Sequence, residues 1–260
     1  LEETKLINNI YSEFAEKYMA MPVIQGSKSE SERFAGAEET LCIEALMQDG
    51  KALQAGTSHF LGQNFAKAFD VKFADKSGKL EYVWATSWGV STRLMGALIM
   101  SHSDDSGLVL PPLLAPTQII IIPLINSEES SEKILNKTND LFNSIKKTGT
   151  RVKIDDRENL SLGFKLNDSE VKGIPMRIVI GEKEVEKDEF DIFYRYNLEK
   201  VSSKFSELTS IVETSIIKIQ EDMILKSKKR LKKHTHEVSS YDEFKAVSYT
   251  HLRAHETRYD

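Results

Sequence analysis

The sequence has a single cysteine, lacks a methionine at position 1, and contains no apolar run of the length that spans a membrane. One cysteine excludes a disulfide framework and any cysteine-rich zinc site. The apolar stretch around Cys42, TLCIEALM, predicts a small core residue. The first residues, LEETKLINNIYSEF, contain no basic region followed by an apolar one, so we expect a cytoplasmic protein without an export signal. Because the chain begins at Leu1, we also expect it to be a piece of a longer protein.

The net charge of −5 is unevenly distributed along the chain. Residues 1–116 hold 10 Lys and Arg against 15 Asp and Glu, whereas residues 117–260 hold 25 of each kind. The stretch KSKKRLKK, residues 226–233, concentrates six positive charges without an acid. Such a local patch binds nucleic acid even in a mildly acidic protein. A cationic helix end that the helix dipole stabilises explains the patch equally well.

The stretch GLVLPPLLAP, residues 107–116, divides the chain, because its prolines cannot sit inside a helix or a central strand. Before it, the patterns predict helices over 1–19, 61–69 and 91 to about 101, with strands over 21–26, 40–47, 52–59, 71–75 and 81–88. The turns between these strands are too short for crossovers. An antiparallel sheet is therefore favoured.

After the connector, strands and helices alternate. We predict strands over 118–124, 150–156, 174–181 and 190–196, and helices over 127–148, over a short segment leading into 167–173, and from about 202 to 233. This alternation predicts a small α/β domain with a mostly parallel sheet. The last helix carries an apolar stripe that we expect to pack in the core: Phe205, Leu208, Val212, Ile216, Ile219 and Met223.

Three neutral polar side chains stand in the apolar stretch LQAGTSHFLGQNFAKAF, residues 53–69. Buried amides, hydroxyls and imidazoles cost free energy unless the protein or a ligand satisfies them. Thr57 and His59 share a face of a regular strand and Gln54 faces the other way, so the three meet only if Gly56 introduces a bulge. Taken alone, His59 is more often a satisfied core histidine.

A second polar group opens the helix predicted after the strand YVWATSWG. Ser91 and Thr92 are residues that cap exposed helix amides, and Arg93 follows in the first turn, where a cation is normally disfavoured. A bound polyphosphate explains this placement. The alternative is a surface arginine paired with Asp104 or Asp105.

Long stretches of the chain resemble prolyl-tRNA synthetases. ERFAGAEETLCIEALMQDGKALQAGTSHFLGQNFAKAF and EYVWATSWGVSTRLMGALIMSHSDDSGLVLPPLLAPTQIIIIPL are similar to the back half of that family's catalytic domain. DDRENLSLGFKLNDSEVKGIPMRIVIG resembles its anticodon-binding domain, and KKHTHEVSSYDEF the start of its C-terminal extension. The uninterrupted passage from FAGA to TSH is similar to the archaeal and eukaryotic-like form.

The resemblance implies an α+β part followed by an α/β part. The first, residues 1–116, would be the C-terminal part of the antiparallel class II synthetase catalytic sheet. The second, residues 117–202, would be a small mixed-sheet anticodon-binding domain, and residues 203–247 a helix with the start of the C-terminal extension. Residues 248–260 resemble translated vector sequence and are expected to be a non-native tail, so His251 and His255 receive no role.

The implied function is ATP-dependent ligation of L-proline to tRNA(Pro) through prolyl-adenylate, in protein translation. The family's first two class II motifs are expected before residue 1, so we expect the 260 residues alone to be inactive and the full-length enzyme to be a homodimer. ATP is expected to carry Mg²⁺, with no metal site on the protein; His102 with Asp104 and Asp105 is not expected to form one. The alternative is a non-catalytic tRNA-binding protein derived from a synthetase.

The resemblance also assigns residues to roles. The implied catalytic residues are Arg93 and His59, the ATP-binding residues are Gln54, Thr57, Ser91, Thr92 and Arg93, and the proline-binding residues are Phe34, His59 and Trp88. The anticodon contacts are expected from Asp156, Arg157, Lys165, Glu170 and Arg195, with Tyr194 as a residue that could stack on a base. For the charged residues near position 156, a solvated loop with pairs between near neighbours is an equally good explanation.

Overall fold

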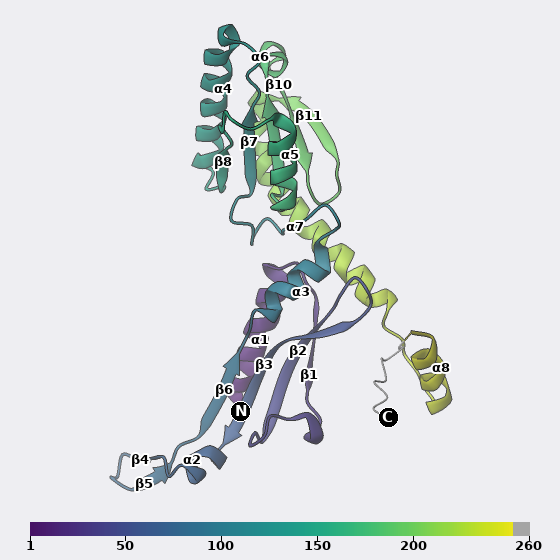
Figure 1. Cartoon of the computed structure of the whole chain (residues 1–260). Helices are drawn as coiled ribbons and strands as arrows, with labels where there is room; N and C mark the ends of the chain where they lie inside the picture. The colour runs from purple at the N-terminus through teal and green to yellow at the C-terminus, as the bar shows by residue number, and fades with distance from the viewer. Residues whose placement is uncertain (252–260) are drawn as a thin grey trace.

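The structure, a computed structural model, describes the backbone of residues 1–251 and the side chains of residues 1–247. Two parts, each with its own sheet, are joined by a connector and by one long helix (Figure 1). The side chains of the predicted tail 248–260, including His251 and His255, lie outside the described residues. No helix among the described residues is long and apolar enough to cross a lipid bilayer.

The N-terminal part is a four-stranded antiparallel sheet, as predicted. Its strands are β1 (Val23–Ser27), β2 (Glu39–Leu46), β3 (Ala52–Gly62) and β6 (Ala85–Gly89), which lie in that order. Helix α1 (Glu2–Lys17) contacts all four strands, and α3 (Arg93–His102) packs at the same core. Acidic residues in the first turn of α1 and Lys17 in its last turn suit the helix dipole. The apolar residues that α1, the strands and α3 bury together form the core of this part: Ala15, Met19, Met21, Ile43, Ala45, Met47, Ala55, Ala97 and Leu98.

The predicted strand over 81–88 is wrong, because the chain leaves one sheet and enters another within it. β5 (Leu80–Tyr82) pairs with β4 (Lys72–Ala74) in a separate ribbon, and only the residues from Ala85 onward join the main sheet. Trp84 lies at the break, where its ring stacks on Phe60 with 5.9 Å between centroids. The predicted helix over 61–69 shortens to α2 (Asn64–Ala68), because β3 continues to Gly62, which has a positive φ of 57°.

The C-terminal part is built on a five-stranded sheet. Its strands are β7 (Ile119–Pro123), β8 (Val152–Ile154), β9 (Met176–Ile180), β10 (Glu189–Tyr194) and β11 (Lys200–Lys204), in the spatial order β11-β10-β9-β7-β8. β7 pairs in parallel with β8 and β9, whereas β9, β10 and β11 pair antiparallel. The mixed sheet is therefore confirmed. The mostly parallel sheet that alternation alone predicted is wrong, because β10 and β11 form a hairpin.

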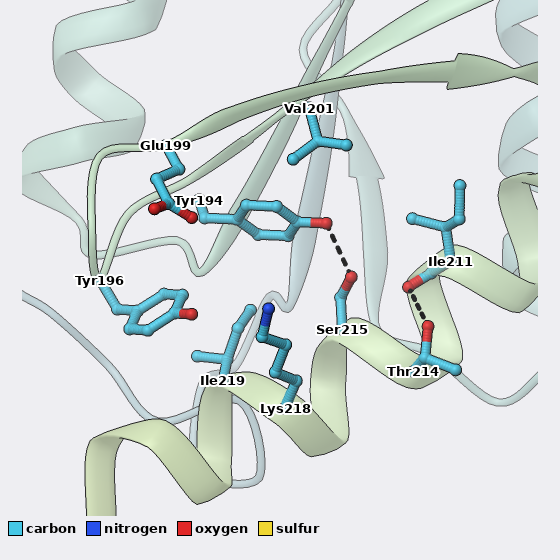
Figure 2. A pocket seen from close by; sticks show the side chains of 9 residues that line it. All are labelled: Tyr194, Tyr196, Glu199, Val201, Ile211, Thr214, Ser215, Lys218 and Ile219. Carbon is cyan, nitrogen blue, oxygen red and sulfur yellow. Dashed lines mark hydrogen bonds between the residues drawn. The ribbon is translucent and has the colours of Figure 1, made fainter. Parts of the chain in front are cut away.

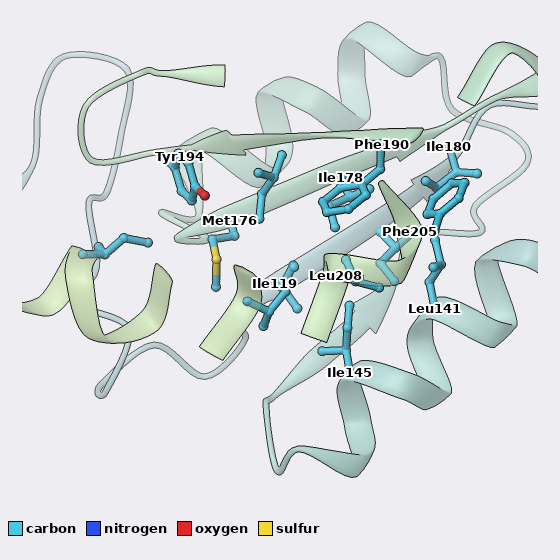
Figure 3. Close-up of a cluster of buried hydrophobic side chains, with 14 of the residues drawn as sticks. Ile119, Leu141, Ile145, Met176, Ile178, Ile180, Phe190, Tyr194, Phe205 and Leu208 are labelled. Atoms are coloured by element: carbon cyan, nitrogen blue, oxygen red, sulfur yellow. The ribbon is translucent and has the colours of Figure 1, made fainter. Parts of the chain in front are cut away.

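The C-terminal half has five described helices, which are α4 (Glu128–Lys147), α5 (Leu162–Val171), α6 (Glu182–Lys187), α7 (Leu208–Lys233) and α8 (Tyr241–His251). The last of them, α8, lies past the end of α7 and away from the sheet (Figure 1). The last long helix starts later than predicted, because β11 and a 3-10 turn at Phe205–Glu207 take up its expected first residues. Figure 3 shows the core that its apolar stripe enters, including Leu208 and Phe205 beside isoleucines of β7 and β9. The predicted core position of the stripe is confirmed.

Helix α7 contacts both parts of the molecule. Val212 and Met223 are buried in the C-terminal core. Toward the N-terminal part, Gln220 Nε2 donates to the carbonyl oxygen of Lys17 at 2.8 Å, and Arg230 Nη2 donates to that of Ser101 at 3.0 Å. The helix therefore connects the C-terminal core to α1 and α3 of the N-terminal part, as Figure 1 shows.

His102, the last residue of α3, predicts a pH dependence of stability. Its Nε2 donates to the carbonyl oxygen of Met19 at 2.8 Å. Burial is the main cause that lowers the pKa of His102 from 6.5 to about 4, and the charges of Arg230 and Lys226 act in the same direction. The unfolded chain therefore binds more protons between these pH values. The contribution of neutral His102 is complete above pH 6.5 and falls by about 3 kcal/mol as the pH drops through 4.

Urea unfolding at a series of pH values between 7 and 4 measures this contribution. His102→Gln keeps a donor for the Met19 carbonyl but does not titrate, so its free energy of unfolding should fall less over that range. The carboxylates titrate in both proteins and cancel in the difference. Equal pH dependence of the two proteins would contradict the role of His102.

Candidate functional site

A bulge in β3 brings together polar residues that a regular strand would separate. Ile43 of β2 lies opposite Gly56, but the next residue, Glu44, lies opposite Gln54, so Ala55 is an extra residue in the ladder. An extra residue changes the face to which the following side chains point. As a result, Gln54 and Thr57 line the same pocket, and the predicted bulge next to Gly56 is confirmed.

This pocket, which we call the β3–α3 pocket, has a volume of about 290 Å³. It is lined by Gln54, Ala55, Gly56, Thr57, Gly89, Val90, Ser91 and Arg93. It lies where β6 ends at Gly89, opposite Thr57. Among the described residues, no strand pairs with the part of β3 before Thr57 on the β6 side. Ser91 Oγ accepts a hydrogen bond from the backbone N–H of Arg93 at 3.3 Å, whereas Thr92 makes no side-chain cap and does not line the pocket.

Arg93 is exposed at the first position of α3 and forms no ion pair with any residue that the structure describes. The predicted alternative, a pair with Asp104 or Asp105, is wrong, because Asp104 binds Arg195 and no ion pair joins Arg93 to Asp105 among the described residues. A free guanidinium beside the amides of a helix N-terminus forms a surface suited to a phosphate or carboxylate.

His59 lies on the same face of β3 as Thr57, one step further along the strand. Its Nδ1 is 2.9 Å from Thr40 Oγ1, and the ring centroid of Phe34 is 5.1 Å from its own. Burial lowers the pKa of His59, so the imidazole is neutral at pH 7. Phe34 is 51% exposed and also stacks on Phe65 with 6.3 Å between centroids. Phe34 and His59 thus form an aromatic wall with one neutral polar group.

Trp88 is not brought together with Phe34 and His59. It pairs with Ser58, whereas His59 pairs with Ser87. Ser58 shares its face with Gly56, at which a Cβ would meet Tyr11 of α1 at 3.1 Å. The alternation of the strand therefore directs Trp88 toward the α1 face and Ser87 toward His59. Only the strand register identifies Ser87, so sequence reasoning missed it.

A larger cavity, which we call the β7–α5 pocket, lies beyond the carboxyl ends of the parallel strands β7 and β8. Its volume is about 750 Å³. Its walls come from the segment after β7, from α4, and from the loop that leads into α5: Pro123, Leu124, Ile125, Asn126, Ser131, Leu135, Asp156, Glu158, Leu160, Ser161, Leu162 and Lys165. Ser161 Oγ caps α5 by accepting from the N–H of Phe164 at 3.3 Å. The crevice beyond the carboxyl ends of parallel strands is the usual ligand-binding position in such sheets.

Charged residues of this loop divide into those bound within the protein and those that are free. Arg157 donates to both carboxylate oxygens of the buried Asp155 at 2.7 Å and to Asp168 at 2.7 Å. The hydrogen bond from Arg157 holds the pKa of Asp155 below its usual value. Lys165 is buried, with its Nζ donating to the carbonyl oxygen of Asp155 at 3.1 Å. Asp156 is exposed and lines the β7–α5 pocket.

The predicted RNA contact of Arg195 is not available, because its side chain is only 2% exposed. Both terminal nitrogens donate to the carboxylate of Asp104, one of them at 2.7 Å. Arg195 also donates to the carbonyl oxygens of Gly107 and Glu170, each at 3.3 Å. Glu170 is half-buried and takes part in this network through its backbone. Arg195 is therefore a buried structural residue.

Tyr194 is also buried and does not present its ring for stacking on a base. Its hydroxyl lies 2.8 Å from Ser215 Oγ of α7. Figure 2 shows both at the edge of a third cavity, about 340 Å³ in volume, between the β10–β11 hairpin and α7. Among the described residues, no group of three or more His, Cys, Asp and Glu could hold a metal ion.

Known proteins resemble this chain over almost all of its length. Residues 118–215 match the family described as "Anticodon binding domain". Proline–tRNA ligases of Christiangramia forsetii and Flavobacterium psychrophilum are 57% and 54% identical over 247 residues, which are 95% of this chain and 50% of each relative. A crystal structure of prolyl-tRNA synthetase from Cryptosporidium parvum, complexed with L-proline and AMP, is 40% identical with a TM-score of 0.85; the match covers 96% of this chain and 54% of that one. The chain thus spans about half the length of the curated relatives it matches.

Substitutions of Asp155 and Asp156 test whether the charge of the first is bound within the protein and that of the second is free. Asp155→Asn removes the charge that binds Arg157 and should lower the free energy of unfolding by roughly 2 kcal/mol, the usual scale for a hydrogen bond to a charged group. Asp156→Asn, its matched control, should change it by less than about 0.5 kcal/mol. Urea unfolding at pH 7 measures both, and equal losses in the two variants would contradict the assignment.

Proposed function

We propose that this chain, a member of the prolyl-tRNA synthetase family, forms part of a proline–tRNA ligase. In that enzyme the β3–α3 pocket would hold ATP, the Phe34–His59 wall would face L-proline, and the β7–α5 pocket would receive the anticodon of tRNA(Pro). ATP and L-proline give prolyl-adenylate and pyrophosphate. The prolyl group then passes to the 3′ end of the tRNA.

The observation that carries this proposal is the meeting in one pocket of Gln54, Thr57 and Arg93, which has no ion-pair partner in the part of the chain that the structure describes. Neutral amide and hydroxyl groups suit the hydrogen-bonding edges of adenine and ribose, and a free guanidinium suits phosphate oxygens. A carboxylate oxygen of proline attacks the α-phosphorus while the bond to pyrophosphate breaks. Negative charge then builds on the leaving group, and Arg93 stabilises it because it is already in position. Mg²⁺ carried by the phosphates would supply further charge neutralisation, and we assign it no protein ligand.

The surroundings of Phe34 and His59 support a role in holding the proline ring. An apolar ring packs well against the exposed face of Phe34. Neutral His59, held by Thr40, adds a hydrogen-bonding group without a charge. In the second step, the terminal hydroxyl of the tRNA attacks the carbonyl carbon of prolyl-adenylate, and AMP leaves.

The β7–α5 pocket supports recognition of unstacked bases. Asp156 and Glu158 offer acceptors for the amino groups on base edges, and Ser161 adds a hydroxyl at the start of α5. Arg157 and Lys165 contribute indirectly, because their hydrogen bonds to Asp155 hold the loop that carries Asp156. A homodimer and a cytoplasmic location belong to this proposal as properties of the full-length enzyme.

A non-catalytic tRNA-binding protein is the second candidate. It would use the β7–α5 pocket alone. The bulge in β3 and the exposed Arg93 favour the enzyme, because a protein that only binds RNA has no use for a second polar pocket.

RNA binding tests the C-terminal half of the proposal. The purified chain should bind an anticodon stem–loop of tRNA(Pro), and Asp156→Asn should weaken binding about tenfold, since losing one discriminating contact to a base costs roughly 1–3 kcal/mol. Asp140→Asn, an exposed aspartate on α4, is the matched control and should bind like the wild type. Fluorescence anisotropy with a labelled stem–loop measures all three. Unchanged affinity of the Asp156 variant would remove this residue from the RNA site.

The role of Arg93 is tested in a ligase of the relatives' full length that carries these residues. Arg93→Gln should slow proline-dependent exchange of pyrophosphate into ATP by roughly 10²–10³-fold, as expected for the loss of one preorganised contact to developing charge. Lys76→Gln, in the exposed turn between β4 and β5, should leave the rate unchanged. The 260-residue chain itself should show no exchange. A normal rate in the Arg93 variant would contradict its phosphate role.

A further inference from the structure

The ion pair between buried Arg195 and Asp104, whose side chain is 47% exposed, joins residues that are 91 positions apart in the sequence. Asp104 follows α3 in the N-terminal part, and Arg195 follows β10 in the C-terminal part. Arg195 uses both terminal nitrogens on one carboxylate, a geometry that fixes direction as well as distance. The hydrogen bonds from Arg195 hold the pKa of Asp104 below its usual value, so this carboxylate is charged at pH 7.

Next to the ion pair, the backbone of the connector packs closely against the backbone at the end of α5. The N–H of Leu108 donates to the carbonyl oxygen of Val171 at 3.0 Å, which ties the connector to the end of α5. A Cβ at Gly107 would lie 2.5 Å from the Cα of Val171, and one at Gly173 would lie 2.6 Å from the Cβ of Leu108. The two glycines therefore permit a direct backbone contact, and the ion pair lies at its edge.

Helix α3 connects this contact to the β3–α3 pocket. Arg93 is its first residue, and Asp104 comes two residues after its last. The helix is about 15 Å long at 1.5 Å per residue and behaves as one rigid element. A change in the geometry of the contact at Asp104 would therefore change the orientation of the C-terminal part relative to Arg93.

Helix α7 makes the second connection between the two parts. It contacts Lys17 through Gln220 and Ser101 through Arg230, and Lys228 pairs with Glu16 at 3.7 Å. One connection alone leaves the C-terminal part free to rotate about it. Two separate connections define one orientation. The connection through Asp104 and Arg195 lies where β10 and α5 end.

We propose that Asp104 and Arg195 are positioning residues that hold the anticodon-binding part at one orientation to Arg93. The β7–α5 pocket and the β3–α3 pocket would then lie at a fixed separation, which a single tRNA must span to be charged. The part of this proposal that concerns tRNA rests on the proposed function. The part that concerns orientation does not.

Distances between spin labels measure the orientation directly in the 260-residue chain. Labels are placed at exposed positions on α1 and α4 through Glu13→Cys and Asn139→Cys, in a Cys42→Ser background. The wild-type pair should give one narrow distance distribution. Asp104→Asn should broaden or split it, whereas Asp105→Asn, the exposed neighbour, should leave it narrow. Arg195→Met is the second variant, because it removes the buried charge instead of leaving it unpaired, and it should broaden the distribution in the same way.

Binding of the anticodon stem–loop distinguishes a change in the orientation of the C-terminal part from a loss of its local fold. Its affinity should stay within about twofold of wild type in the Asp104 and Arg195 variants, because the β7–α5 pocket does not include either residue. Narrow, unshifted distributions in both variants would overturn the proposal. Loss of stem–loop binding in these variants would also overturn it, since Arg195 would then support only the local fold. Failure of the wild-type chain to bind the stem–loop would instead count against the proposed function.

Discussion

The extra residue in β3 is the constraint on which the proposed nucleotide site depends. Without the bulge at Ala55, Gln54 would face the side of the sheet opposite Thr57, and no single ligand would reach both. The end of β6 at Gly89 opens the edge of β3 beside them, and the chain then turns into α3 with Arg93 at its first position. A local irregularity in pairing therefore converts an ordinary antiparallel sheet into a polar pocket.

Arginines in this protein serve two opposite purposes, and burial separates them. Arg195 is almost completely buried, satisfies its donors within the chain, and joins the two parts. Arg93 is exposed and unpaired among the described residues, so its charge is available to a ligand. Removing the partner of Arg195 leaves a buried charge without compensation, whereas removing the guanidinium of Arg93 affects only the ligand that binds to it. This difference explains why the same residue type is structural at one position and a candidate for catalysis at the other.

Much of the fold follows from local patterns, and its departures have physical causes. Continuous isoleucines predict β7 because a strand covered on both faces needs no alternation. Gly56 lies next to the bulge, where a Cβ would meet Tyr11 at 3.1 Å and Val90 at 3.3 Å, so its lack of a side chain permits close packing. The break after Tyr82 could not be read from the sequence, because an aromatic run has the same pattern whether it stays in one sheet or passes between two. The pairing of Arg195 with Asp104 cannot be predicted from the sequence, because a contact across 91 residues leaves no local signal. The sequence also does not distinguish Asp155 from Asp156, because only the sheet determines which of the two neighbours is buried.

The most direct test of the central claim is a crystal structure of a full-length ligase carrying these residues, with a non-hydrolysable analogue of prolyl-adenylate bound. The account predicts that Gln54 and Thr57 hydrogen-bond the nucleotide, that Arg93 contacts its phosphate, and that the prolyl ring lies against Phe34 and His59. An analogue bound away from the bulged end of β3, with Gln54 and Arg93 free of contact, would contradict it.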